Sequence, residues 1–273
     1  MRLRITHETT YRYTQPVARA IQVLRLTPQN HNGQFVADWR LDVSADGRLT
    51  PIDDPFGNSA HSFSSDGPLD TLTITASGEV GSDDTAGIVR GAIERLPMPV
   101  YLRQTPLTTA DEALADFAHA TAFGTDDPLD LLHTLNRGLH ERLRRDPPSA
   151  TPVRAAAEIF ADGGGTAQEL AHVFLAAARA AGAPCRYVAG YLYSDAGGRE
   201  SDAGHAWAEA HVDGIGWIGF DPSLGVCPAD EHVRVATALD WLGAAPLRGA
   251  RTGGEGETIA VRVVVEAVGG SRG

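Results

Sequence analysis

Cysteines, basic residues and long apolar runs are all scarce in this chain. Its 273 residues include two cysteines, Cys185 and Cys227, which are too few for a disulfide framework. Lysine and arginine number 23 against 35 acidic residues, and the formal net charge of −12 argues against a nucleic-acid or anionic-membrane binder. No apolar run is long enough to span a bilayer, and the first residues alternate like a strand rather than forming a basic, then apolar leader. We therefore expect a cytoplasmic protein with no nucleic-acid or membrane partner.

The first third of the chain has the pattern of a β domain. Apolar residues make up 42% of the whole chain, which is typical of a globular protein with one large or two modest domains. In residues 1–80 apolar and polar residues alternate in short runs, and Asp46–Gly47 and Asp66–Gly67 indicate turns between strands. Glycine, aspartate and proline then cluster in residues 81–109, so we expect a connector there.

Residues 110–250 have the pattern of a mixed domain. Alternation favours strands in 186–193, 205–212 and 217–220, and the turn pair Asp213–Gly214 suggests that the last two form a hairpin. Residues 240–251 are expected to form a loop. The C-terminal segment 251–273 contains a last strand at 259–265, and the sequence leaves open which sheet that strand joins. Helical spacing of apolar residues predicts three further helices, at 111–119, 130–144 and 153–160.

A run of glycines leads directly into the helix that we expect at the centre of this domain. Thr166 and Glu169 follow Gly163–Gly165 and form a T-x-x-E capping box, and Gly182 and Pro184 end the helix. Ala167 is the first helical residue, where free N–H groups and the helix dipole favour an anion. A thiolate there would have a lowered pKa and oxyanion donors beside it, but the residue is alanine.

Four segments carry a family resemblance. Residues 165–172 have the sequence GTAQELAH, residues 182–191 GAPCRYVAGY, residues 204–209 GHAWAE and residues 216–223 GWIGFDPS. In this order they resemble the motifs G-x-C-Q-D-x-A-H, G-x-P-A-R-Y-V-x-G-Y, H-A-W-x-E and G-W-x-G-F-D-P of bacterial transglutaminase-like proteins. The resemblance covers nearly the whole chain and implies an α+β fold. In that fold an antiparallel β-sandwich precedes a papain-like core whose central helix packs on an antiparallel sheet.

The resemblance also implies a catalytic triad. It places Ala167 where the family carries its nucleophilic cysteine, His205 as general base and Asp221 as the acid that orients it. The predicted hairpin is compatible with this, because Asp221 falls roughly opposite the start of the strand that carries His205. The implied reaction is acyl transfer from an amide, through a thioester, to an amine or to water. The implied partner is a peptide or amide-bearing substrate; whether the reaction is transfer or hydrolysis, and the oligomeric state, stay open.

Other residues are candidates for roles near this triad. Trp207, Gln168 and Tyr191 are candidate substrate contacts, although a core position is an equal alternative for Trp207 and a strand-core position for Tyr191. His172 is expected to pack in the core because it lies five residues after Ala167. Cys185 and Cys227 lack a helix N-terminus, so neither is expected to be the nucleophile. We expect no cofactor and no metal, because His172, His205 and His211 show no familiar ligand spacing and no calcium loop is present.

The alanine at position 167 admits three interpretations. It is an inactivating Cys→Ala substitution, which the intact surrounding motif favours; or it marks a natural pseudoenzyme that binds peptides or amide ligands in an inherited cleft. In the third interpretation His205 and Asp221 perform a different chemistry without a thiol.

Overall fold

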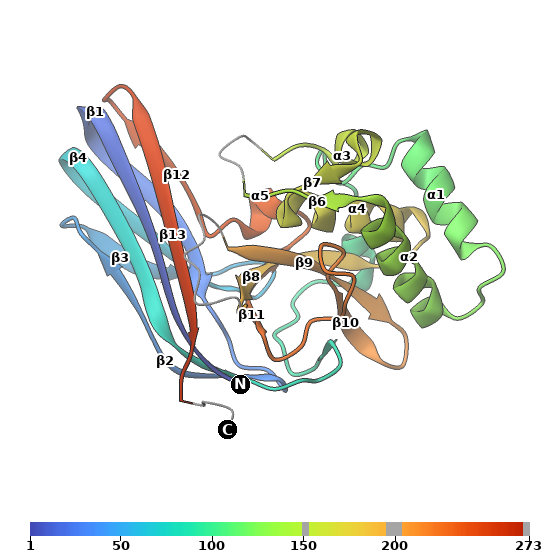
Figure 1. Ribbon diagram of the computed structural model, residues 1–273. Helices are drawn as coiled ribbons and strands as arrows, with labels where there is room; N and C mark the ends of the chain where they lie inside the picture. The colour runs from blue at the N-terminus through green and yellow to red at the C-terminus, as the bar shows by residue number, and fades with distance from the viewer. Residues whose placement is uncertain (149–152, 195–203, 270–273) are drawn as a thin grey trace.

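Two large sheets and a set of helices divide the molecule into a β part and a mixed part (Figure 1). The computed structural model describes residues 1–148, 153–194 and 204–269. Both large sheets are antiparallel, which confirms the expected α+β class. Within the described residues, no helix is long and apolar enough to cross a membrane.

Two very long strands build the N-terminal β-sandwich. β1 (Arg2–Thr27) and β4 (Ser59–Ser82) pair with each other along most of their length, and both continue from one layer of the sandwich into the other. β2 (Gln34–Val43) extends one half of β4 and β3 (Arg48–Ile52) the other. Tyr11 and Leu72 from one half and Leu24 and Phe63 from the other join a single apolar cluster. The predicted sandwich is therefore one sheet folded over on itself.

The predicted turn at Asp66–Gly67 does not separate two strands, because β4 continues through these residues from one layer of the sandwich into the other. The β1–β4 register shifts between Arg12 and Arg19, opposite this point. A Cβ atom on Gly67 would lie 2.0 Å from the carbonyl oxygen of Val17. Glycine at this position therefore allows two backbones to approach closely where the β1–β4 ladder is irregular.

The C-terminal strands join the N-terminal sheet. β12 (Leu247–Thr252) pairs with the second half of β1, and β13 (Glu257–Ala267) pairs with its first half. The loop expected over residues 240–251 is wrong. A short helix, α5 (Trp241–Ala244), follows the N-cap Asp240, and β12 finds its partner in a strand more than 200 residues earlier, which no local pattern reveals.

The mixed part is a five-stranded sheet in the order β11-β8-β9-β10-β5, with α4 (Ala167–Ala180) packed against β8 and β9. Its two edge strands were not predicted. They are β11 (His232–Ala238) and β5 (Ile88–Val89), and β5 lies inside the expected connector. The other elements are β8 (Cys185–Leu192), β9 (His205–Val212), β10 (Gly216–Phe220), η1 (Met98–Leu102), α1 (Glu112–Ala122), α2 (Pro128–Arg142), α3 (Ala156–Asp162) and the short parallel pair β6 (Arg144–Arg145) and β7 (Gly164–Gly165).

Two side-chain carboxamides from the β part hydrogen-bond the free backbone groups along the edge of β11. The Gln34 side chain accepts from the Arg234 N–H at 2.8 Å and donates to the Arg234 carbonyl at 2.8 Å. Asn58 makes the same pair of bonds with Thr237, also at 2.8 Å each. All four residues are buried, so water cannot replace these bonds. The two parts of the molecule are thus joined by carboxamides that bond the edge of β11 as the backbone of a neighbouring strand would.

Replacing Asn58 by alanine is expected to lower the free energy of unfolding by about 2 kcal/mol, because a buried N–H and a buried carbonyl of Thr237 lose their partner. Urea denaturation measures the change. Asn32 is the matched control: its carboxamide also bonds two backbone groups, those of Arg90 and Ile88, but it is exposed. Asn32→Ala should cost less than about 0.5 kcal/mol, since water takes over the bonds. Equal losses for the two variants would contradict the role assigned to burial.

Candidate active site

The start of α4 is rigidly built. Gly163 has φ +73°, the left-handed conformation that ends α3, and Thr166 is the N-cap of α4. The predicted capping box is present: the Glu169 N–H donates to Thr166 Oγ1 at 3.4 Å, and the Thr166 N–H donates to Glu169 Oε2 at 2.9 Å. Arg154 Nε donates to the other Glu169 oxygen at 3.1 Å. Ala167 is the first residue of the helix and is 6% exposed. Its surroundings therefore keep the free N–H groups of a helix start in a fixed place.

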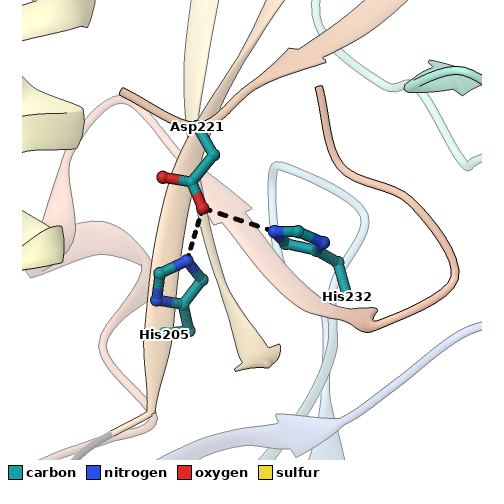
Figure 2. A group of neighbouring side chains, drawn as sticks. All are labelled: His205, Asp221 and His232. Atoms are coloured by element: carbon teal, nitrogen blue, oxygen red, sulfur yellow. Dashed lines mark hydrogen bonds and ion pairs between the residues drawn. The ribbon is translucent and has the colours of Figure 1, made fainter. Parts of the chain in front are cut away.

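His205 and Asp221 are in direct contact, as the hairpin predicted. His205 is the first residue of β9 and Asp221 follows β10 directly, and the two strands pair antiparallel. His205 Nε2 lies 2.6 Å from Asp221 Oδ2 (Figure 2). Both side chains are buried. The carboxylate thus fixes the imidazole and leaves its Nδ1 as the nitrogen available to a reacting group.

Burial and charge act in opposite directions on this pair. Burial lowers the pKa of His205, and the Asp221 carboxylate only partly offsets it, so the imidazole is neutral at neutral pH. Burial alone would raise the pKa of Asp221, but His205, His232 and Ser223 overcome it and hold this pKa well below its usual range. A neutral imidazole beside an ionised carboxylate is the resting state that a general base requires.

A second histidine, His232, binds the same carboxylate oxygen. Its Nε2 lies 3.3 Å from Asp221 Oδ2, the oxygen that His205 also contacts (Figure 2). Asp221 Oδ1 accepts from the Ser223 N–H and hydroxyl at 2.9 and 2.7 Å and from the Leu224 N–H at 3.3 Å. Sequence analysis missed His232 because it begins β11, a strand that was not predicted, and no motif spacing points to it.

His205, Asp221 and His232 could be considered as a metal-ligand set, since one ligand atom of each lies within 4.8 Å of the others. The hydrogen bonds argue against this. His232 Nδ1 accepts the Ala229 N–H at 3.3 Å, so its proton is on Nε2, the atom that faces Asp221. A metal ligand needs a free lone pair on that nitrogen. The arrangement of His205, Asp221 and His232 therefore fits a hydrogen-bonded cluster and not a cation-binding site.

A cavity of about 1040 Å³ opens beside His205 and the first turn of α4. His205, Thr166, Gln168 and Tyr191 line it, and Gln168 Nε2 donates to the Gly204 carbonyl at 3.1 Å, which ties the helix start to the residue before His205. Tyr191 Oη bonds His7 Nδ1 at 3.0 Å. The opposite wall comes from β1 and the C-terminal strands, so both parts of the molecule shape the cavity. The other lining residues that these strands supply are Thr9, Tyr11, Arg25, Leu26, Leu247, Glu257, Ile259, Ala260 and Val261.

Trp207 is not among the residues that line this large cavity, so the structure favours the core position over the predicted substrate contact. It is 2% exposed and packs edge-on against His232, with ring centroids 5.3 Å apart. A Cβ atom on Gly190 would lie 2.6 Å from the Trp207 ring, so the indole packs in space that any side chain at position 190 would fill. Trp207 therefore supports the site from within the core, next to a small void of about 40 Å³.

The structure gives no support to an alternative nucleophile among the cysteines. Cys185 is fully buried, and burial raises the pKa of its thiol to about 11. Burial also raises the pKa of Cys227. His172 is buried and its Nε2 accepts the Trp241 N–H at 2.9 Å, in line with the expected packing role. Ala167, which is also not among the residues that line the large cavity, remains the candidate nucleophile position, because its neighbour Gln168 bonds the residue before His205.

Comparison with known proteins gives two family matches. Residues 3–81 match the bacterial transglutaminase-like N-terminal region, and residues 115–222 match the transglutaminase-like superfamily. An uncharacterised protein of Mycobacterium leprae is 26% identical over 267 residues, which cover 92% of this chain and 94% of the relative. An uncharacterised protein of Mycobacterium tuberculosis is 28% identical over 274 residues, covering 91% and 87%.

A solved structure shares the fold. The crystal structure of a candidate cysteine protease from Cytophaga hutchinsonii superposes with a TM-score of 0.74 at 18% identity, covering 99% of this chain and 92% of that chain. At this identity the likeness concerns the fold alone.

Proposed function

Because the chain belongs to the transglutaminase-like superfamily, we propose that it carries the site of a cysteine acyl-transfer enzyme, with Ala167 at the position of the nucleophile. One observation carries this proposal: a neutral imidazole, His205, is held by the buried carboxylate of Asp221 beside the start of a capped helix. These are the base, the orienting acid and the oxyanion donors of thiol-dependent acyl transfer.

The geometry supports the following sequence of steps for a cysteine at position 167. His205 Nδ1 takes the thiol proton, and the sulfur attacks the carbonyl carbon of an amide. The oxyanion lies against N–H groups at the start of α4. The C–N bond breaks as His205 returns the proton to the leaving amine, which gives a thioester. His205 then deprotonates an amine or a water molecule, whose attack breaks the C–S bond; the product leaves, and His205 returns this proton to the sulfur.

In the chain with Ala167 the first of these steps is absent, so we propose that this chain binds substrate without turning it over. An inactivating Cys→Ala substitution is our first explanation. A natural pseudoenzyme that binds peptides or amide ligands is the second, and the size of the cavity beside an intact His205–Asp221 pair favours retained binding in either case. We further propose a cytoplasmic location, because both cysteines are free thiols.

Product analysis of the Ala167→Cys variant tests the proposed reaction. The variant is incubated with a peptide and with a glutamine amide, with and without a primary amine, and the products are separated by mass. An acylated amine indicates transfer and a free acid indicates hydrolysis. If a folded variant forms neither product, the proposal is contradicted. Titration calorimetry of the Ala167 chain against the same peptides tests the binding-only alternative, and heat indistinguishable from dilution would count against it.

A further inference from the structure

One carboxylate oxygen of Asp221 accepts from two imidazoles. The bond from His205 is 2.6 Å and the bond from His232 is 3.3 Å, and both end on Oδ2. The other oxygen is already occupied by Ser223 and Leu224. His232 of β11, which is not part of the predicted triad, therefore also contacts the proposed base–acid pair.

The tautomer of His232 makes it a donor. The Ala229 N–H points at its Nδ1, so the ring carries its one proton on Nε2 and donates it to Asp221. Backbone bonds fix this arrangement: the Asp221 N–H donates to the Val226 carbonyl at 2.8 Å, and the His232 N–H donates to the Ala229 carbonyl at 3.0 Å. The chain from Asp221 to His232 is thus a loop closed by backbone bonds and by the bond between its two end side chains, which holds these residues at a set distance.

We propose that His232 is a positioning residue of this site: its Nε2–H orients Asp221 toward His205 and shares the charge that Asp221 offers to His205. This inference rests on the proposed function, in which His205 must both accept and return a proton. Sharing the oxygen weakens the hold of Asp221 on the imidazolium form, so that form returns its proton to the leaving amine more readily.

Asp221, His232 and Arg145 are the side chains that act most on His205. Asp221 raises the pKa of His205, while burial, His232 and Arg145 of β6 lower it. Trp207 contributes an apolar face, with its ring centroid 6.1 Å from that of His205. Among these groups His232 is the one that acts on both partners of the pair, because it alone also donates to the Asp221 oxygen that His205 contacts.

The test measures the pKa of His205 by imidazole NMR in the Ala167 chain, which needs no turnover. His232→Phe keeps a ring against Trp207 and removes the donor; we expect it to raise the pKa of His205 by about one unit. His232→Gln restores an N–H donor and should bring the pKa back toward that of the parent chain. Should the Phe variant not fold, His232→Met provides a donor-free side chain of nearly the size of Gln. An unchanged or lowered pKa in the donor-free variant would overturn the proposal.

Kinetics in the Ala167→Cys background give a second readout. There His232→Phe is expected to lower kcat about tenfold with little change in KM and to shift the acidic limb of the pH profile upward, and His232→Gln to restore both. If Ala167→Cys proves inert, the proposed function fails while the NMR titration still decides the role of His232. A fall in kcat that His232→Gln does not repair would also count against positioning through the donor.

Discussion

The Ala167→Cys variant is expected to show thiol-dependent turnover of amide substrates on the order of 10⁶-fold above the chain with alanine, since loss of the nucleophile removes nearly all turnover in enzymes of this kind. The physical reason is the place of residue 167. A thiol there lies at a helix N-terminus, where the dipole and free N–H groups lower its pKa, and the neighbouring Gln168 bonds the residue before His205. Iodoacetamide alkylation followed from pH 5 to pH 9, together with amide and ester assays, measures both consequences.

The same helix offers a matched control. Ala171 lies one turn further along α4 and is fully buried, so Ala171→Cys adds the same thiol to the same helix away from its start. It should alkylate slowly and show no turnover. A second control, Ala167→Ser, keeps the position and replaces the thiol with a poorer nucleophile. If Ala167→Cys folds but neither alkylates faster than Ala171→Cys nor acts on any substrate, the enzyme hypothesis loses its main support.

Replacing Glu209 by glutamine is expected to lower the free energy of unfolding by about 3–5 kcal/mol, the cost of breaking a buried ion pair and leaving charge uncompensated. Glu209 is fully buried and accepts from Arg186 Nε at 2.6 Å and Arg234 Nε at 2.7 Å. The Arg186 guanidinium also lies 3.8 Å from the ring centroid of Trp217. Both arginines are buried, so neither can move its charge into water without opening the sheet. Urea unfolding at pH 7 measures the loss.

Glu79 is the control for this variant. It too is one carboxylate between two arginines, Arg2 and Arg4, but those arginines are exposed. Glu79→Gln should therefore change stability far less, because water screens and replaces the ion pairs. Similar losses for Glu79→Gln and Glu209→Gln would show that burial is not the cause.

The contribution of Glu209 also depends on pH, with a definite sign. Burial alone would raise its pKa, but Arg234 and Arg186 overcome burial and hold the pKa at about 2, below its ordinary value of 4.5. Because the pKa of Glu209 is lower in the folded state than in the unfolded state, its carboxylate stabilises the fold above about pH 4.5. This stabilisation is lost as the pH falls toward 2. The gap in stability between the parent chain and Glu209→Gln should thus narrow below pH 4.5. A constant gap from pH 7 to pH 3 would contradict this.

Local patterns predicted the elements that carry the proposed chemistry. The capping box of Thr166 and Glu169 fixed the start of α4 to the residue, and alternation placed His205 and Asp221 on facing strands of a hairpin. These features succeeded because helix caps and hairpins are determined by residues a few positions apart.

What the sequence did not reveal depends on residues far apart in the chain. β11 was missed because all its residues are buried, including polar ones such as Arg234, whose partners Glu209 and Gln34 lie 25 and 200 residues away. β1 was divided into short strands because 26 residues is far beyond the usual strand length. The family motifs likewise mix two kinds of residue. His205 and Asp221 form the site, whereas Arg186, Glu209 and Trp217 come from three different motifs and meet as one buried cluster.

The pairing of β1 with both β12 and β13 also constrains how the protein is made. β1 leaves the ribosome well before the strands that cover one of its edges, which begin at Leu247, roughly 220 residues later. At ~5–20 residues per second, that edge stays open for roughly 10–45 seconds of translation. The sandwich, and with it one wall of the cavity, can close only after β12 and β13 have been synthesised. A nascent chain halted before residue 247 should therefore be far more sensitive to proteolysis than the full chain, and this interval is the one in which a chaperone would be needed.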